Sequence, residues 1–365
     1  MRPLQVLVIG AVMLEAAGAT VFEADARRGA DLFASEMCLR CHSVNGKGGR
    51  IAPDLGRRAD RDYTPAGLAS LMWNHAPQMW KTARAEMIQL PPLSEAQAAD
   101  LFAYFYSARY FEKPGDAARG KRLFTEQHCV SCHAIGGAGP GKPVSEWESL
   151  ADPVMLLARI WNHTSQMRAA FAEKKIAWPQ FNAQEMTDLL VYVQNLPHTQ
   201  NTIMEFSLTQ PDAGKALFES KGCVDCHSGK LALEGRLAHT TLTGVAAAMW
   251  NHSHEMLQMP PALSDDEMRS IVSYVWAKQF FAEQGSAGRG KRIFAQKNCA
   301  GCHNDPSSGA PSLARGKDAY SSVAMVSALW RHGPRMLERI EKKNLAWPRF
   351  TSAEMSDLVA YLNTL

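Results

Sequence analysis

Every cysteine in the chain belongs to one repeated pattern whose residue types can hold a cofactor. The eight cysteines form four C-x-x-C pairs, and a histidine directly follows each pair. These triplets are Cys38, Cys41 and His42; Cys129, Cys132 and His133; Cys223, Cys226 and His227; and Cys299, Cys302 and His303. Two thiols at this spacing can add to the vinyl groups of one porphyrin, and the adjacent imidazole can bind its iron. The pattern therefore predicts four covalently bound haem c groups.

Other uses of paired cysteines fit this sequence less well. A zinc ribbon needs a second pair about 15–20 residues from the first. Here the pairs begin at positions 38, 129, 223 and 299, which are much further apart. A thioredoxin-like site would need strands alternating with helices, and strand patterns are scarce. Disulfides are common in exported proteins, but the repeated histidine favours haem attachment.

A second repeated block contains two more residues that can bind iron. Its copies are WNHAPQM at 73–79, WNHTSQM at 161–167, WNHSHEM at 250–256 and WRHGPRM at 330–336. If the block is helical, its His and Met share one face, yet one iron can accept only one of them. Pro77 and Pro334 are expected to start a new helix, where proline is well tolerated.

Composition and charge limit the class of protein. The chain has 365 residues, a net charge of +3, 46% hydrophobic residues and 21% charged residues. These values fit a globular protein of about two to four domains and give no sign of nucleic-acid binding. Residues 1–19 resemble a secretory signal peptide with cleavage after Ala19, so we expect an exported or periplasmic protein. No later apolar run of about 18 residues predicts a membrane span.

The surrounding elements repeat with the cysteines. A glycine lies nine residues before each pair and a phenylalanine five before it: Gly29, Gly120, Gly214 and Gly290, with Phe33, Phe124, Phe218 and Phe294. Because glycine weakens a helix, its repetition there predicts a close contact with another helix. An amphipathic helix preceded by Ser94, Asn182, Ser264 or Thr351 closes each unit. The first and last helices of each unit are therefore expected to cross.

The repeats divide the chain into four domains after residues 1–19. The expected bounds are 20–112, 113–200, 201–284 and 285–365. Ala-Trp-Pro occurs at 177–179 and 346–348, in the second and fourth units only. The chain therefore reads as a duplicated module that binds two haems.

Each unit resembles a class I cytochrome c domain, through its early Gly and Phe, its CxxCH motif and its closing helix. The resemblance implies an all-α fold of four tandem domains, each around one haem. It also implies that a proline soon after the haem histidine orients the imidazole through its carbonyl. Pro53 and Pro311 fit this role, and Pro140 or Pro143 are candidates. The third unit has no such proline.

The sixth iron ligand is left open between two sets. Class I domains usually take a Met after the middle helix, but that place holds Leu90, Trp178, Met259 and Trp347. The repeated block offers the replacement. We favour Met79, Met167, Met256 and Met336, because a Met ligand follows the family and raises haem potential. The alternative ligands are His75, His163, His252 and His332, with Met259 a further candidate in the third unit.

The resemblance implies a periplasmic carrier that passes electrons between other redox proteins. No nucleophile or acid–base pair stands out, so no catalytic residue is predicted. One alternative is a multihaem oxidoreductase with one open haem, for which domain 3 is the candidate. Another is a subunit of a respiratory complex. The block tryptophans Trp73, Trp161, Trp250 and Trp330 are expected against the haem edge, either in simple packing or donating to a propionate.

Overall fold

The described part of the protein is mostly helical. The computed structural model describes residues 24–56, 64–108, 115–147, 153–196, 211–233, 241–256, 261–281, 285–314 and 319–365. The predicted all-α class is confirmed, since 65% of these described residues are helical and 1% are in strands. In these ranges no helix combines the length and apolar character needed to cross a bilayer. The expected signal peptide at 1–19 lies outside the described residues.

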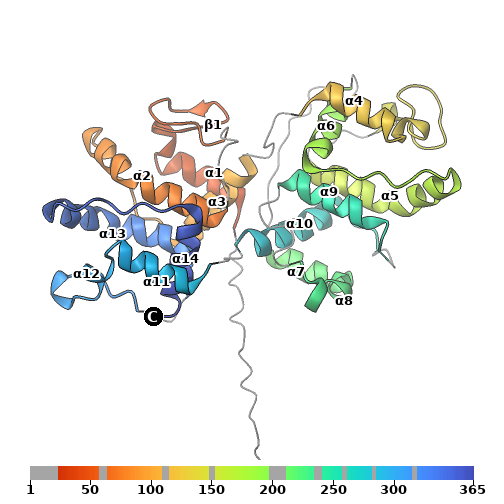
Figure 1. The fold of residues 1–365 in the computed structure, drawn as a ribbon. Coiled ribbons are helices and arrows are strands. Elements are labelled where there is room, and N and C mark those ends of the chain that lie inside the picture. The colour runs from red at the N-terminus through yellow and green to blue at the C-terminus, as the bar shows by residue number, and fades with distance from the viewer. Residues whose placement is uncertain are drawn as a thin grey trace, which may run out of the picture.

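Three long helices recur in each of the four units (Figure 1). We call the first, middle and closing helix of a unit by their order in it. They are α1 (Ala26–Ser35), α2 (Pro65–Ala85) and α3 (Glu95–Ala108) in domain 1; α4 (Ala117–Glu126), α5 (Pro153–Glu173) and α6 (Ala183–Gln194) in domain 2; α7 (Pro211–Ser220), α9 (Leu242–Ser253) and α10 (Asp265–Phe280) in domain 3; and α11 (Ala287–Gln296), α13 (Ser322–Lys342) and α14 (Ser352–Leu362) in domain 4.

Short elements connect the first and middle helices. A small antiparallel hairpin in domain 1 pairs β1 (Ser43–Val44) with β2 (Lys47–Gly48). The CxxCH segments form single turns, at η1 (Cys38–Arg40), η2 (Cys129–Ser131), α8 (Cys223–Cys226) and α12 (Ala300–His303). Three further turns follow them, at η3 (Val144–Glu146), η4 (Gly229–Leu231) and η5 (Pro306–Ser308).

The first and closing helices of each domain cross at the repeated glycine, as predicted. The helix pairs in contact are α1 with α3, α4 with α6, α7 with α10 and α11 with α14. A Cβ atom added at Gly29, Gly120, Gly214 or Gly290 would overlap a carbonyl oxygen of the closing helix. Only glycine therefore lets the two backbones approach this closely. The phenylalanine four residues later is buried beside the crossing in every domain.

An ion pair strengthens this crossing in three of the domains. Arg28 binds Asp100, Arg119 binds Asp188 and Arg289 binds Asp357, each through two guanidinium nitrogens. The carboxylate also accepts the backbone N–H that precedes the first helix. Domain 3 has Ala213 and Ser270 at the corresponding positions, so both partners of the pair are replaced together.

The closing helices begin at the predicted caps. Asn182, Ser264 and Thr351 each form a capping box with the glutamate three residues later. Ser94 makes the same reciprocal pair of bonds with Gln97. These bonds satisfy N–H groups that the first turn of a helix leaves without partners. They fix where each closing helix starts.

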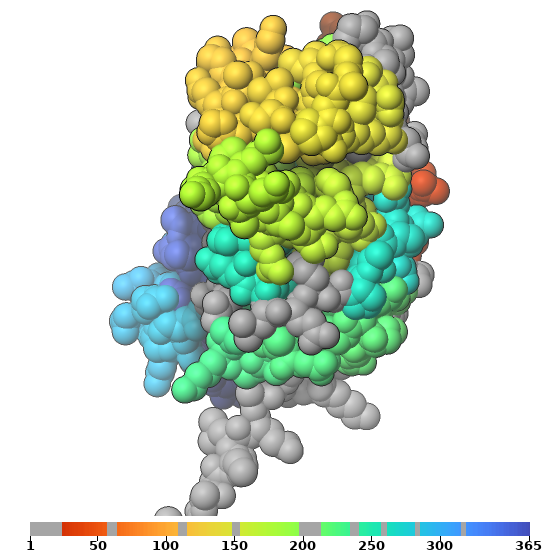
Figure 2. Space-filling view, turned by 90° about the vertical axis from the view of Figure 1, so that its right-hand side faces the viewer, coloured from red at the N-terminus to blue at the C-terminus, as the bar shows by residue number. Residues whose placement is uncertain are grey.

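The domains pair in space differently from their order in the sequence (Figure 1). Helices α2 and α3 of domain 1 pack on α13 and α14 of domain 4, and we call this pair lobe A. Helices α5 and α6 of domain 2 pack on α9 and α10 of domain 3, forming lobe B. Figure 2 faces lobe B and shows the yellow-green surface of domain 2 lying against the teal surface of domain 3. The halves of the duplicated module therefore do not correspond to the two lobes.

The expectation that Pro77 and Pro334 start new helices is wrong. Both lie inside continuous helices, α2 and α13. An internal proline removes one hydrogen bond of the helical ladder and frees the carbonyl four residues earlier. For Pro77 that carbonyl belongs to Trp73, and it accepts the indole N–H of Trp347 from domain 4 at 3.0 Å. The interface between the domains thus uses the group that the proline releases.

Candidate haem sites

The CxxCH segment turns sharply away from the first helix of its domain. The residue before each pair has a positive φ: Met37 (66°), His128 (63°), Gly222 (76°) and Asn298 (54°). The histidine after the pair then donates its backbone N–H to the carbonyl of the first cysteine, at 2.8–3.0 Å in all four domains. In domain 1 this turn brings Cys38 and His42 to the wall of one pocket.

A backbone carbonyl orients each of these imidazoles. Nδ1 lies 3.0 Å from the oxygen of Pro53 for His42 and 2.9 Å from that of Pro311 for His303. Since a carbonyl can only accept, Nδ1 carries the proton and Nε2 is left to bind a metal. The role predicted for Pro53 and Pro311 is therefore confirmed.

The two middle domains use other carbonyls for the same purpose. His133 Nδ1 lies 2.9 Å from the oxygen of Lys142, so the expectation for Pro140 or Pro143 is wrong. The carbonyl that orients His133 belongs to Lys142, the residue directly before Pro143. His227 Nδ1 lies 3.4 Å from the oxygen of Leu231, the longest of the four contacts. Domain 3 thus orients its imidazole through a carbonyl that does not belong to a proline.

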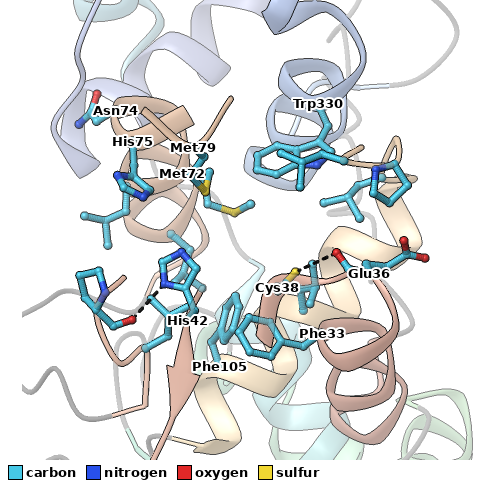
Figure 3. Close-up of a pocket in the computed structure, with 18 of the residues that line it drawn as sticks. Phe33, Glu36, Cys38, His42, Met72, Asn74, His75, Met79, Phe105 and Trp330 are labelled. Atoms are coloured by element: carbon cyan, nitrogen blue, oxygen red, sulfur yellow. Dashed lines mark hydrogen bonds between the residues drawn. The ribbon is translucent and has the colours of Figure 1, made fainter. Parts of the chain in front are cut away.

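The block histidine lies opposite the CxxCH histidine. The ring centres are 6.0 Å apart for His42 and His75, 6.0 Å for His133 and His163, and 5.8 Å for His227 and His252. Two imidazoles bound to one iron from opposite sides, each at about 2 Å, have ring centres roughly 6 Å apart. In Figure 3, His75 lies over His42 with the gap between them continuing into the pocket. The spacing fits a porphyrin held between the two rings.

The two histidines of domain 4 also interact electrostatically. Burial lowers the pKa of His332, and the nearby Arg331, Arg335 and His303 lower it further. His303 belongs to the CxxCH motif, so the two histidines of domain 4 also lie near each other. A low pKa keeps the His332 imidazole neutral, which is the form that binds metals.

The block methionines lie beside the histidines. Met79 and Met72 extend into the domain 1 pocket to the side of His75 (Figure 3). Met167 and Met336 occupy the same place in α5 and α13, and both are half-buried. Met256 lies just beyond α9, because that helix ends at Ser253. Met259 lies outside the described residues.

The pocket of domain 1 suits a haem. It is a cavity of about 380 Å³ with mainly apolar walls, within the usual range for cofactor pockets. Cys38 and His42 lie on one wall and His75 and Met79 on another. All eight cysteines of the protein are free of disulfides. Burial raises the pKa of the Cys38, Cys129 and Cys299 thiols to about 11, so they are neutral at pH 7.

The Trp and Asn of the repeated block serve domain pairing, a role that the sequence did not reveal. The indole N–H of Trp73 donates to the oxygen of Pro348 at 2.8 Å, and that of Trp250 to Pro179 at 2.7 Å. Donation to a propionate is therefore wrong for these two tryptophans. Trp347 packs against Trp73 at 5.4 Å in lobe A. Trp178 stacks on Trp250 at 4.4 Å in lobe B.

These contacts explain the repeated Ala-Trp-Pro motif. Trp178 and Trp347 occupy the place where class I domains carry their Met ligand. Both indoles instead donate across the interface, to the carbonyls of Trp250 and Trp73. The usual ligand position has become a contact between domains.

The block asparagine adds a pair of hydrogen bonds at each interface. The Asn251 side chain donates to the oxygen of Phe181 and accepts from its N–H, at 2.8 and 2.9 Å. Asn74 binds Phe350 in the same way, and Asn162 binds Leu263. Asn162 of domain 2 binds domain 3, and Asn251 of domain 3 binds domain 2. Each domain of lobe B therefore contributes one such pair of hydrogen bonds. An asparagine that recurs at the same place of the block in three units is the sequence signal that could have suggested this role.

Comparison with known proteins gives the family. The family model of cytochrome c matches residues 26–108, 117–197 and 287–365, more than half of the chain. The chain therefore belongs to the cytochrome c family, and its four CxxC motifs make it a multihaem c-type cytochrome with four covalent haems. The third unit lies outside the matched ranges but has the same crossing helices and paired histidines. No curated protein and no solved structure matched the chain.

Proposed function

We propose that this cytochrome carries electrons between redox proteins and is not itself a catalyst. The observation that supports this most strongly is the pair of histidines, about 6 Å apart between ring centres, in domains 1, 2 and 3. When bound, each haem supplies a one-electron iron couple. Two fixed protein ligands keep the iron environment similar in both redox states, which favours rapid electron transfer.

We further propose His75, His163, His252 and His332 as the sixth ligands. Their separation from the CxxCH histidines favours them over Met79, Met167, Met256 and Met336. The methionines would then cover the porphyrin beside the ligand. Met256 has the weakest placement of the four, since it lies beyond the end of its helix. The methionine set remains the alternative.

Domain 2 offers a matched test, because both candidate ligands lie in α5. His163→Ala should convert one of the four ferric low-spin haems to high spin, as seen by electron paramagnetic resonance. Met167→Ala should leave all four low-spin, with near-infrared bands typical of two nitrogen ligands. If Met167→Ala produces the high-spin haem and His163→Ala does not, the methionine assignment is correct.

A multihaem oxidoreductase is the second candidate function, and domain 3 supports it. Its His227 has the longest carbonyl contact, 3.4 Å, and its middle helix is shorter than the others. Carbon monoxide added to the reduced protein separates the two functions. A carrier with four filled iron sites should show no fast spectral change, whereas an open haem binds at once. His252→Ala provides the positive control, since it opens domain 3 deliberately.

We also propose that the protein is exported and loses residues 1–19. The support is the signal-like composition of that segment, together with the family. Mass measurement of the mature protein should show an N-terminus at Thr20 and four added haem groups. Retention of Met1 would argue against export through this segment.

A further inference from the structure

One position of the repeated block differs in charge from domain to domain. The residue before the block methionine is Gln78 in domain 1, Gln166 in domain 2, Glu255 in domain 3 and Arg335 in domain 4. It follows the block histidine by three residues, so in a helix it lies on the same face. The position is therefore neutral in two domains, negative in the third and positive in the fourth.

Glu255 lies against the block histidine of domain 3. Its Oε2 is 3.5 Å from Nδ1 of His252, and its Oε1 is 4.0 Å from Nε2 of His254. The contact with His252 is made by the ring nitrogen that faces away from an iron bound at Nε2. A carboxylate at this position increases the electron density of a metal-bound imidazole.

Arg335 lies beside the block histidine of domain 4. It is in α13 one helical turn after His332, and Arg331 directly precedes the same histidine. Both arginines therefore lie within three residues of His332 on one helix. Arg331 also donates to Ser327 Oγ at 3.1 Å, which holds its charge near the start of the block. Domain 4 thus has two cations at its candidate ligand, whereas domain 3 has an anion.

Other charges near the described sites do not offset this difference. The domain 1 pocket is lined by Glu36 and Arg349, whose charges oppose each other. Lys221 of domain 3 is paired with Glu267, and Lys297 of domain 4 is paired with Glu354. The two ion pairs are equivalent, so they do not distinguish domain 3 from domain 4. Within the CxxCH motif, domain 3 has Asp225 where domain 4 has Gly301, and this anion acts in the same direction as Glu255.

The sign of the effect follows from electrostatics. Reduction lowers the positive charge at iron, so a nearby anion disfavours reduction and a nearby cation favours it. Exposed charges are screened by water and salt. Glu255 and Arg335 are both exposed, so their effect on the iron is reduced by screening but keeps its sign. Domain 3 should therefore have the lowest reduction potential and domain 4 the highest.

The two domains lie in different lobes. Tyr106 of domain 1 packs on Trp276 of domain 3, with ring centres 4.7 Å apart, and joins lobe A to lobe B. The domain contacts thus run in the order 2, 3, 1, 4. Because the lowest reduction potential is expected in lobe B and the highest in lobe A, electrons that pass along this order move from lobe B to lobe A.

We propose that Glu255 and Arg335 set the direction of electron transfer, from lobe B to lobe A. The proposal rests on the carrier function proposed above. A reduced redox protein gives one electron to lobe B, and lobe A gives one electron to an oxidised redox protein. The two side chains bias this transfer without taking part in it.

The chain itself supplies the substitution for the test. Glu255→Gln and Arg335→Gln install the residue already present in domains 1 and 2. The four midpoint potentials of the holoprotein are measured by redox titration with electron paramagnetic resonance. Glu255→Gln should raise the lowest potential, Arg335→Gln should lower the highest, and the double variant should narrow the range.

Matched controls remove the same charges elsewhere in the same domains. Glu219→Gln on α7 and Lys342→Gln at the end of α13 change exposed residues outside the block, and should leave all four potentials unchanged. The proposal is overturned if the block variants shift the midpoint potentials no more than these controls do, or if either potential moves in the opposite direction. Four low-spin haems that titrate reversibly would then still support a carrier. Loss of reversible titration in the unaltered protein would instead contradict the carrier function.

Discussion

Asp357 stabilises the helix crossing of domain 4 through three hydrogen bonds. It accepts two bonds from Arg289, at 2.6 and 2.8 Å, and one from the N–H of Ser286 at 2.7 Å. The residue is almost fully buried, so removing its carboxylate leaves these donors without an equivalent partner. Asp357→Ala should therefore lower the free energy of unfolding by about 2 kcal/mol, measured by denaturant titration with circular dichroism.

Domain 3 offers the control for this prediction. Ser270 occupies the corresponding position, and Ala213 replaces the arginine. Ser270→Ala removes no ion pair. We therefore expect it to lower the free energy of unfolding much less than Asp357→Ala does. Equal losses would mean that the helix crossing depends on packing at the glycine and not on the charged pair.

The same carboxylate predicts a dependence on pH. The Arg289 guanidinium, followed by the Ser286 N–H, holds the pKa of Asp357 below its ordinary value of 3.8 despite the opposing effect of burial. A lowered pKa stabilises the folded state above the unfolded pKa, and this stabilisation is lost as pH falls through the folded value. The stability difference between the unaltered protein and Asp357→Asn should be constant from about pH 7 to 5 and shrink below about pH 4. A difference that persists at about pH 2 would exclude the charge as its source.

At the scale of elements, the middle helix of each unit does two jobs. One face carries the candidate iron ligand, and residues a few positions earlier bind the neighbouring domain. In α9, Trp250 and Asn251 contact domain 2, and His252 faces His227. The haem pocket and the interface are thus built from consecutive residues, so movement at one should be felt at the other.

The reciprocal asparagine bonds can be tested one lobe at a time. Asn251→Ala removes the acceptor of the Phe181 N–H, and this backbone group is buried. A loss of about 1.4 kcal/mol corresponds to a tenfold change in an opening equilibrium. Amide hydrogen exchange at Phe181 should therefore become about tenfold faster or more, as measured by nuclear magnetic resonance.

Asn74→Ala is the matched experiment in lobe A. It should accelerate exchange at Phe350 and leave Phe181 unchanged, since Asn74 accepts only the Phe350 N–H. Acceleration of both amides by either variant would show that the lobes do not open independently.

Much of each unit could be predicted from sequence because local signals specify it. The crossing glycines, the capping residues and the CxxCH motif act within one domain, and the proline carbonyls were anticipated for His42 and His303. The roles of Trp73 and Asn74 depend on a partner more than 270 residues away, which no local pattern reveals. The continuous helix through Pro77 was missed for the same reason, because the carbonyl it frees is satisfied by domain 4. The proposal of His75 over Met79 depends on the distance between two rings, which sequence spacing alone does not give.

At the scale of the whole molecule, the pairing of domain 1 with domain 4 means that the chain leaves lobe A, builds lobe B and returns. Domains 1 and 2 are neighbours in sequence, yet the most extensive helix packing of domain 1 is with domain 4, and Tyr106 adds a contact with domain 3. Lobe A should therefore be held together by its interface, without a covalent link between domains 1 and 2. The Trp73–Trp347 contact and the Asn74–Phe350 bonds are the main contributors.

A protease site inserted between domains 1 and 2, followed by cleavage of the full-length holoprotein, tests this arrangement. The fragment with domain 1 and the fragment with domains 2 to 4 should elute together in size-exclusion chromatography. Asn74→Ala, Trp347→Ala and Tyr106→Ala together remove the bonds and the indole packing of lobe A and the ring contact with Trp276 of domain 3, so the cleaved variant should separate. The equivalent variant of lobe B, Asn251→Ala with Trp178→Ala, should keep domain 1 bound after cleavage. Separation of the unaltered fragments would mean that domain 1 is tethered only by the chain, and the contact order 2, 3, 1, 4 would no longer describe the molecule.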